Sequence, residues 1–276
     1  MPGTSLGVAA AGGAVLHAEI IDLTPPWLID PPTIVMSHGV ATDCEIWNGW
    51  LPHLVAHARI VRFDSRGFGR SPMPTGEGWK LETWAADILA VADAAGADRF
   101  HLLAESAAGA AALHVASGAS ASRVLSVATC SAPYRGSDLP RVADWRQRLE
   151  REGMAAWAAR MMTERFHEGA LSPGAADWFA VRQAAADPAV LANVAEGLMG
   201  VDLSDALPRI AVPALIMAAD GSPYVTVEIA RAMQRLIPDA ELRIVPHSRH
   251  GIPFSHADAC AADYLAFLRR RGGFGS

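Results

Sequence analysis

Ser106 stands where a sequence could place a nucleophile. The strand-like run Arg99–Ala104 precedes it, and the helix-prone, alanine-rich tract Ala107–Ala116 follows it. A strand that turns sharply into a helix exposes a serine hydroxyl above a sheet, usually in the pattern G-x-S-x-G. Ala104 and Ala108 occupy the two glycine positions here. The segment therefore predicts either a nucleophile on such an elbow or a serine that caps a helix.

A serine hydroxyl becomes a good nucleophile only when a base takes its proton. His250 lies in a loop after the strand-like run Arg243–Val245, with His247 as the alternative base in the same loop. Asp220 follows the strand-like run Ala214–Ala218 and could orient the imidazole. Serine, acid and histidine in this order are typical of one hydrolase architecture. Taken singly, the aspartate also fits a turn before glycine, and the histidine fits a solvated loop.

Two backbone N–H groups complete the predicted chemistry. The stretch Ser37–Val40 follows a β-branched run, and its glycine allows a sharp turn that leaves the N–H of Val40 free. The N–H of Ala107, directly after Ser106, would point to the same place. Such donors stabilise the negative charge that develops on a carbonyl oxygen during acyl transfer. Taken alone, the stretch Ser37–Val40 also fits a simple loop.

The elements that must position these residues alternate along most of the chain. Strands alternating with helices predict a mostly parallel sheet covered on both faces, with ligands bound beyond the carboxyl ends of the strands. Residues 134–207 show helical patterns only, which predicts an inserted helical cap between two core segments, 1–133 and 208–276. The expected strands are Leu6–Ala11, Ala14–Asp22, Thr33–Ser37, Arg59–Phe63, Arg99–Ala104, Val124–Thr129, Ala214–Ala218 and Leu242–Val245.

Composition narrows the class of protein further. The chain has 276 residues, 51% of them hydrophobic, with a formal net charge of −6 and three widely spaced cysteines. We expect a soluble cytoplasmic protein without disulfides, a membrane span or a nucleic-acid surface. The loop Asp64–Pro72 lacks a complete nucleotide-binding motif, and no metal-binding pattern appears. We expect a small, partly hydrophobic molecule as partner and no cofactor or metal; the sequence leaves homo-oligomer formation open.

The sequence resembles the α/β-hydrolase superfamily over nearly its whole length, and it is most similar to the branch of 3-oxoadipate enol-lactonases and related esterases. The motifs that carry the resemblance are Ser37–Gly39 with Trp47 downstream, Arg62–Ser71, the elbow around Ser106, Trp145-Arg146, Asp202-Leu203 before Leu207, Ile210 and Pro213, and the loop Pro246–His250.

The resemblance implies an α/β-hydrolase fold with an eight-stranded, mostly parallel sheet flanked by helices. It implies Ser106 as nucleophile, His250 as general base, and the N–H groups of Val40 and Ala107 as oxyanion hole. The acid of the family usually precedes the proline of the turn after the expected strand Ala214–Ala218. Ser222 occupies that position here, so Asp220, two residues earlier, is our prediction for the acid.

The expected function is a cofactor-independent serine hydrolase that cleaves a small ester, lactone or enol-lactone through an acyl-enzyme on Ser106. Three alternatives remain open. The same site could perform acyl transfer or perhydrolysis, or it could hydrolyse a carbon–carbon bond. The serine at position 222 also leaves open a homologue that binds a ligand without catalysis.

Overall fold

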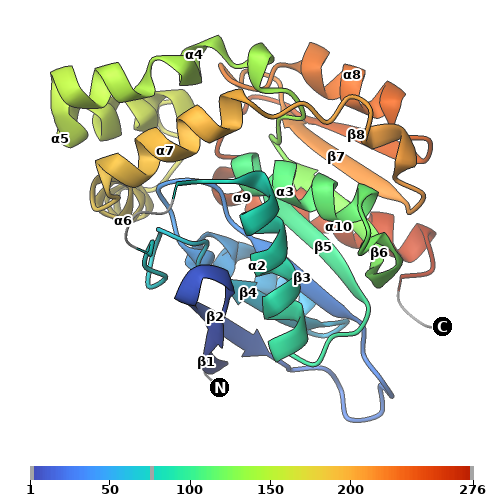
Figure 1. The fold of residues 1–276 in the computed structure, drawn as a ribbon. Helices are drawn as coiled ribbons and strands as arrows, with labels where there is room; N and C mark the ends of the chain where they lie inside the picture. Colours follow the sequence, from blue (N-terminus) through green and yellow to red (C-terminus); the bar gives the residue numbers. More distant parts are fainter. Residues whose placement is uncertain (1–2, 75–77, 274–276) are drawn as a thin grey trace.

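The computed structural model describes residues 3–74 and 78–273, in which eight strands form a single sheet (Figure 1). The strand order is β1-β2-β4-β3-β5-β6-β7-β8; β1 and β2 run antiparallel to their neighbours, and the remaining pairs are parallel. The strands are β1 Thr4–Ala9, β2 Val15–Ile21, β3 Thr33–Ser37, β4 Arg59–Phe63, β5 Phe100–Glu105, β6 Val124–Cys130, β7 Ala214–Ala219 and β8 Ala240–Val245. The predicted eight-stranded, mostly parallel sheet is confirmed.

Helices cover both faces of the sheet. The helices α2 (Leu81–Ala94), α3 (Ser106–Ser117) and α8 (Val227–Leu236) share one buried apolar cluster. On the opposite face, α10 (Ala257–Arg270) packs with the 3-10 helix η2 (Cys44–Trp50) in a second cluster. The shorter elements are η1 Ala11–Gly13, α1 Leu51–Leu54, η3 Ala121–Arg123, η4 Gly136–Asp138, η5 Leu207–Arg209 and α9 Ile252–Ser255.

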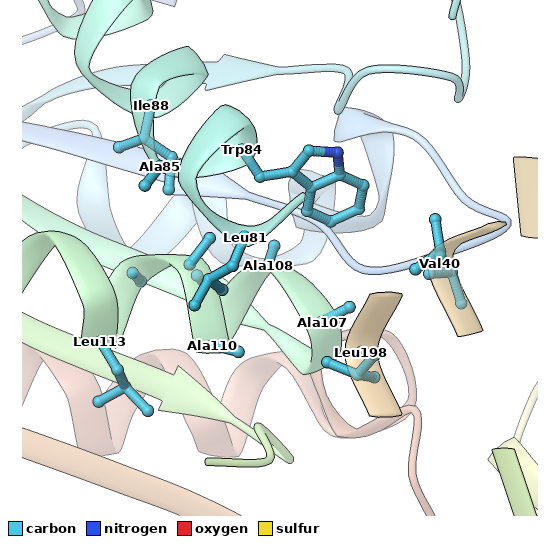
Figure 2. Close-up of a cluster of buried hydrophobic side chains, with 14 of the residues drawn as sticks. Val40, Leu81, Trp84, Ala85, Ile88, Ala107, Ala108, Ala110, Leu113 and Leu198 are labelled. Carbon is cyan, nitrogen blue, oxygen red and sulfur yellow. The ribbon is translucent and has the colours of Figure 1, made fainter. Parts of the chain in front are cut away.

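The alanine-rich composition of α3 follows from its central position. Ten of its 12 residues are buried, because it packs on β5, on β6 and on α2 at once. Small side chains allow these close approaches without voids. Figure 2 shows the contact, in which larger side chains of α2 lie against the small ones of α3. Its labelled residues on these two helices are Leu81, Trp84, Ala85, Ile88, Ala107, Ala108, Ala110 and Leu113.

One expected helix is divided. The spacing of Trp47, Trp50, Leu51 and Leu54 predicts a single helix over Glu45–His57, whereas the structure has η2 followed by the four-residue α1. Pro52 explains the break, because it has no N–H to donate to the carbonyl four residues earlier. Trp50 still reaches the interior, where its Nε1 donates to the Pro253 carbonyl at 2.8 Å.

Four helices between β6 and β7 lie across the end of the sheet that carries the carboxyl ends of β5 and β7 (Figure 1). They are α4 Pro140–Ala143, α5 Trp145–Arg165, α6 Pro173–Ala184 and α7 Pro188–Met199. This helical insert falls within the segment expected as a cap, and the cap boundaries at 134 and 207 stay a prediction. The outer ends of the two predicted core segments, residues 1–2 and 274–276, lie outside the described residues. Within the described ranges, no helix is long and apolar enough to cross a membrane.

Candidate active site

Ser106 begins α3 directly after β5 and has a positive φ of 52°. Non-glycine residues rarely adopt this left-handed conformation, so the turn is strained in the way that exposes a side chain above the sheet. Gly109 provides the space that the turn needs, because a Cβ there would lie 2.3 Å from the Cβ of Ala132. Ala104 and Ala108, in place of the usual glycines, are fully buried. The elbow therefore tolerates alanine at both positions.

His250 brings its imidazole to this serine from the loop after β8. The Oγ atom of Ser106 lies 3.0 Å from Nε2 of His250. His250 is only 5% exposed. Burial, together with the nearby Arg165 cation, lowers the pKa of His250 to about 3. The imidazole is therefore neutral at neutral pH, which is the form that a general base requires.

The other imidazole nitrogen contacts Ser222. The Oγ atom of Ser222 lies 3.1 Å from Nδ1 of His250. It also accepts hydrogen bonds from the backbone N–H groups of Tyr224, at 3.3 Å, and Val225, at 3.2 Å. A neutral hydroxyl therefore occupies the place where a carboxylate would stabilise the imidazolium. The sequence places Ser222 at the usual position of the acid, but no feature of the sequence indicates this contact with His250.

Asp220, our predicted acid, is engaged elsewhere. Its Oδ2 accepts from the N–H of His247 at 2.7 Å, and its Oδ1 accepts from the N–H of Ser248 at 2.9 Å. The hydrogen bond from Ser248, followed by that from His247, lowers the pKa of Asp220. The expected contact between Asp220 and His250 is thus replaced by contacts that hold the backbone of the histidine loop. His247, the alternative base, has a positive φ of 52° in this turn, whereas His250 faces Ser106.

The predicted oxyanion donors belong to residues that lie beside Ser106. Val40 and Ala107 are both buried and line the same cavity as the nucleophile. The turn before Val40 requires glycine, because a Cβ on Gly39 would lie 2.9 Å from Oε2 of Glu105 and 3.0 Å from the Cβ of Ser106. The N–H of Gly39 donates to that Glu105 oxygen at 2.9 Å. The two donor roles themselves stay predictions.

A largely apolar cavity lies over the serine, between the sheet and the insert. Its volume is about 420 Å³, including space that is open to solvent. The polar lining is Ser106, His250, Tyr224 and Arg165; apolar lining includes Leu139, Val142, Trp145, Met161, Val194 and Leu198.

One group of side chains elsewhere has the spacing of metal ligands. Ligand atoms of His17, Cys44 and Asp64 lie within 4.8 Å of one another. The Asp64 carboxylate already accepts from the N–H of Cys44 at 2.8 Å and from Arg70 Nε at 3.0 Å. Burial raises the pKa of the Cys44 thiol, which opposes the thiolate that a metal needs. We interpret the group as a structural ion pair.

Comparisons with known proteins agree on one family. A model described as "Alpha/beta hydrolase family" matches residues 34–263. The sequence is 26% identical over 254 residues to a protein of Caulobacter sp. (strain K31) named "Putative carbamate hydrolase RutD", covering 87% of this chain and 91% of that protein. It is 28% identical over 225 residues to 3-oxoadipate enol-lactonase 1 of Acinetobacter baylyi, covering 79% and 81%.

Solved structures share the fold. An enol-lactonase from Burkholderia xenovorans LB400 superposes with a TM-score of 0.84 at 24% identity, covering 96% of this chain and all of that one. A thermophilic esterase from Thermogutta terrifontis gives a TM-score of 0.83 at 21% identity, covering 98% and 99%.

Proposed function

The chain belongs to the alpha/beta hydrolase family, and we propose that it is a cofactor-independent serine hydrolase that cleaves a small ester, lactone or enol-lactone. The observation that supports this most directly is the 3.0 Å approach of Ser106 Oγ to Nε2 of His250, on a strained turn beneath a largely apolar cavity. The enol-lactonase and esterase among the similar proteins support the same bond class.

In the proposed reaction, His250 Nε2 accepts the hydroxyl proton as Ser106 Oγ attacks the carbonyl carbon. The carbonyl oxygen takes the negative charge and is bound by the N–H groups of Val40 and Ala107. The tetrahedral intermediate collapses, the alkoxide leaves with the proton from His250, and an acyl-enzyme remains. Water then gives a proton to His250 and attacks the acyl carbon. The bond from this carbon to Ser106 Oγ breaks, Oγ takes the proton from His250, and the acid is released. In a lactone, the leaving alkoxide stays attached to the same product.

In this mechanism, Ser222 is the hydrogen-bond partner of the second imidazole nitrogen of His250. In the imidazolium, Nδ1–H can donate to the Ser222 hydroxyl, 3.1 Å away, and the positive charge gains no carboxylate at that position.

Acyl transfer, perhydrolysis and carbon–carbon hydrolysis use the same nucleophile. Product analysis with competing alcohols, hydrogen peroxide or a β-diketone separates these reactions from hydrolysis.

The test compares Ser106→Ala with Ser117→Ala, a control serine at the far end of the same helix that bonds to the Leu113 carbonyl. We expect Ser106→Ala to abolish hydrolysis of p-nitrophenyl acetate and butyrate and to prevent labelling by a fluorophosphonate, and Ser117→Ala to retain both. Retained turnover in Ser106→Ala would refute the mechanism. A wild-type protein that resists the probe, yet melts at a higher temperature with a ligand, would support the binding homologue instead.

A further inference from the structure

Arg165 is a buried cation that faces the cavity above the nucleophile. It ends α5 and is 2% exposed, and it lines the cavity together with Ser106 and His250. Its Nη2 donates to the Val40 carbonyl at 2.8 Å, but Nε and Nη1 find no hydrogen-bond partner among the residues that the structure describes. Nε and Nη1 carry three of the five N–H donors of a guanidinium.

Among the described residues, no carboxylate accepts a hydrogen bond from Nε or Nη1 of Arg165. The carboxylates of Glu105 and Glu164 act on its charge from nearby, but each accepts a hydrogen bond from another group. An oxygen of Glu105 accepts from the N–H of Gly39 at 2.9 Å, and Glu164 accepts from the hydroxyl of Tyr224. A buried cation is costly unless hydrogen bonds and an opposite charge compensate it. The other neighbour of Arg165 is the ring of Phe179, 5.3 Å from the guanidinium carbon.

We propose that the substrate is a small ester or lactone that carries a carboxylate, and that Nε and Nη1 of Arg165 bind this group. A planar guanidinium matches a carboxylate with paired hydrogen bonds. The apolar side chains of the insert then surround the carbon skeleton between this carboxylate and the reacting carbonyl at Ser106. The inference rests on the proposed function, because it names the substrate class of the same site.

The formal net charge of −6 makes a local cation more informative. The overall field of a chain with this charge does not favour an anion, so binding of an anion in the cavity depends on a local cation. The alternative role for Arg165 is structural, with the guanidinium serving only to tie the insert to the Val40 carbonyl. The two roles predict different responses to a charged and a neutral substrate.

The test compares monoethyl succinate with ethyl butyrate, whose acyl chains differ by a carboxylate in place of a methyl group. We expect the wild-type protein to prefer monoethyl succinate in kcat/KM. In Arg165→Gln this preference should fall by about 10- to 100-fold, mainly through KM, because charge-assisted hydrogen bonds are lost. Arg165→Lys, which keeps the charge, should recover part of it. Arg148→Gln, which removes a partly exposed arginine of α5 that pairs with Asp144, is the matched control.

A binding measurement separates this inference from the proposed function. Ser106→Ala cannot turn over the ester, so monoethyl succinate should raise its melting temperature, whereas it should not raise that of Ser106→Ala/Arg165→Gln. If wild type hydrolyses neither ester while Ser106→Ala binds monoethyl succinate, the proposed function fails and the anion site stands. If wild type shows no preference for the carboxylate ester, or the preference survives in Arg165→Gln, the anion site is refuted. Should Arg165→Gln not fold, the wild-type preference and Arg165→Lys decide.

Discussion

Replacing Ser222 by alanine tests how this site works with a hydroxyl beside its histidine. The substitution removes the contact of 3.1 Å with Nδ1 of His250. This hydrogen bond strengthens when the imidazole becomes an imidazolium, by about 0.5–1.5 kcal/mol, which corresponds to roughly 2- to 12-fold in kcat. Loss of the proper carboxylate function in a serine triad instead costs about 10⁴-fold. We therefore expect Ser222→Ala to lower kcat by only about 2- to 12-fold.

Ser222→Ala should also lower stability, because the N–H groups of Tyr224 and Val225 lose their acceptor. An unsatisfied buried donor costs about 1–3 kcal/mol. The melting temperature must therefore be measured beside kcat, so that loss of folded protein is not counted as loss of catalysis. A p-nitrophenyl ester at saturating concentration gives kcat, and titration with a fluorophosphonate gives the concentration of active sites.

Asp220→Ala provides the matched comparison. Because the Asp220 carboxylate binds the N–H groups of His247 and Ser248, the substitution should loosen the histidine loop and lower kcat far less than Ser106→Ala does. Two results would refute the reasoning. A loss above about 10³-fold in Ser222→Ala would show that the hydroxyl does more than a hydrogen bond from an imidazolium to a neutral hydroxyl can do. A loss near 10⁴-fold, roughly, in Asp220→Ala would assign the acid to that carboxylate after a loop rearrangement.

The buried histidine predicts a kcat/KM that stays near its plateau at mildly acidic pH in short assays and falls only as pH approaches the His250 pKa of about 3; a fall near pH 6.5 would contradict the burial. Because unfolded histidine binds a proton below about pH 6.5 and the folded form does not, the free energy of unfolding, measured in urea, should decrease as pH falls below that value. Gly109→Ala should destabilise the fold by about 1–3 kcal/mol in urea titrations, because the new Cβ meets Ala132; unchanged stability would show that the elbow has more room. Arg182 in α6 binds Asp43 at 2.7 Å and Glu45 at 2.6 Å, so Arg182→Ala should accelerate amide exchange in the insert while exchange in β5 stays the same; equal rates in α6 before and after the change would argue against this anchor.

Much of the fold could be predicted because the residues that are buried in the folded protein form recognisable apolar patterns along the sequence. Central strands such as Thr33–Ser37 are buried on every residue, and their continuous apolar runs are visible in the sequence. The proximity of Ser106 and His250 could also be predicted. Each residue follows the end of a strand, and parallel strands bring such ends together.

The side chain that contacts Nδ1 of His250 and the role of Arg165 could not be predicted in this way. Asp220 and Ser222 are two residues apart, and only the hydrogen bonds of the folded loop decide which of them faces His250. The buried position of Arg165 involves a hydrogen bond to the carbonyl of Val40, which lies 125 positions earlier in the sequence. No local pattern distinguishes it from the solvated arginines of the same helix, because its burial depends on how the insert packs over the core.

The contact between Arg165 and the Val40 carbonyl connects the helical insert directly to the loop after β3. The residue that it holds is the one whose N–H is proposed to bind the oxyanion. A chimaera that borrowed the insert of a relative would need a donor for this carbonyl, or the loop after β3 would lose one of its fixed points. We therefore expect changes in the insert that displace Arg165 to alter the rate of the reaction as well as its specificity.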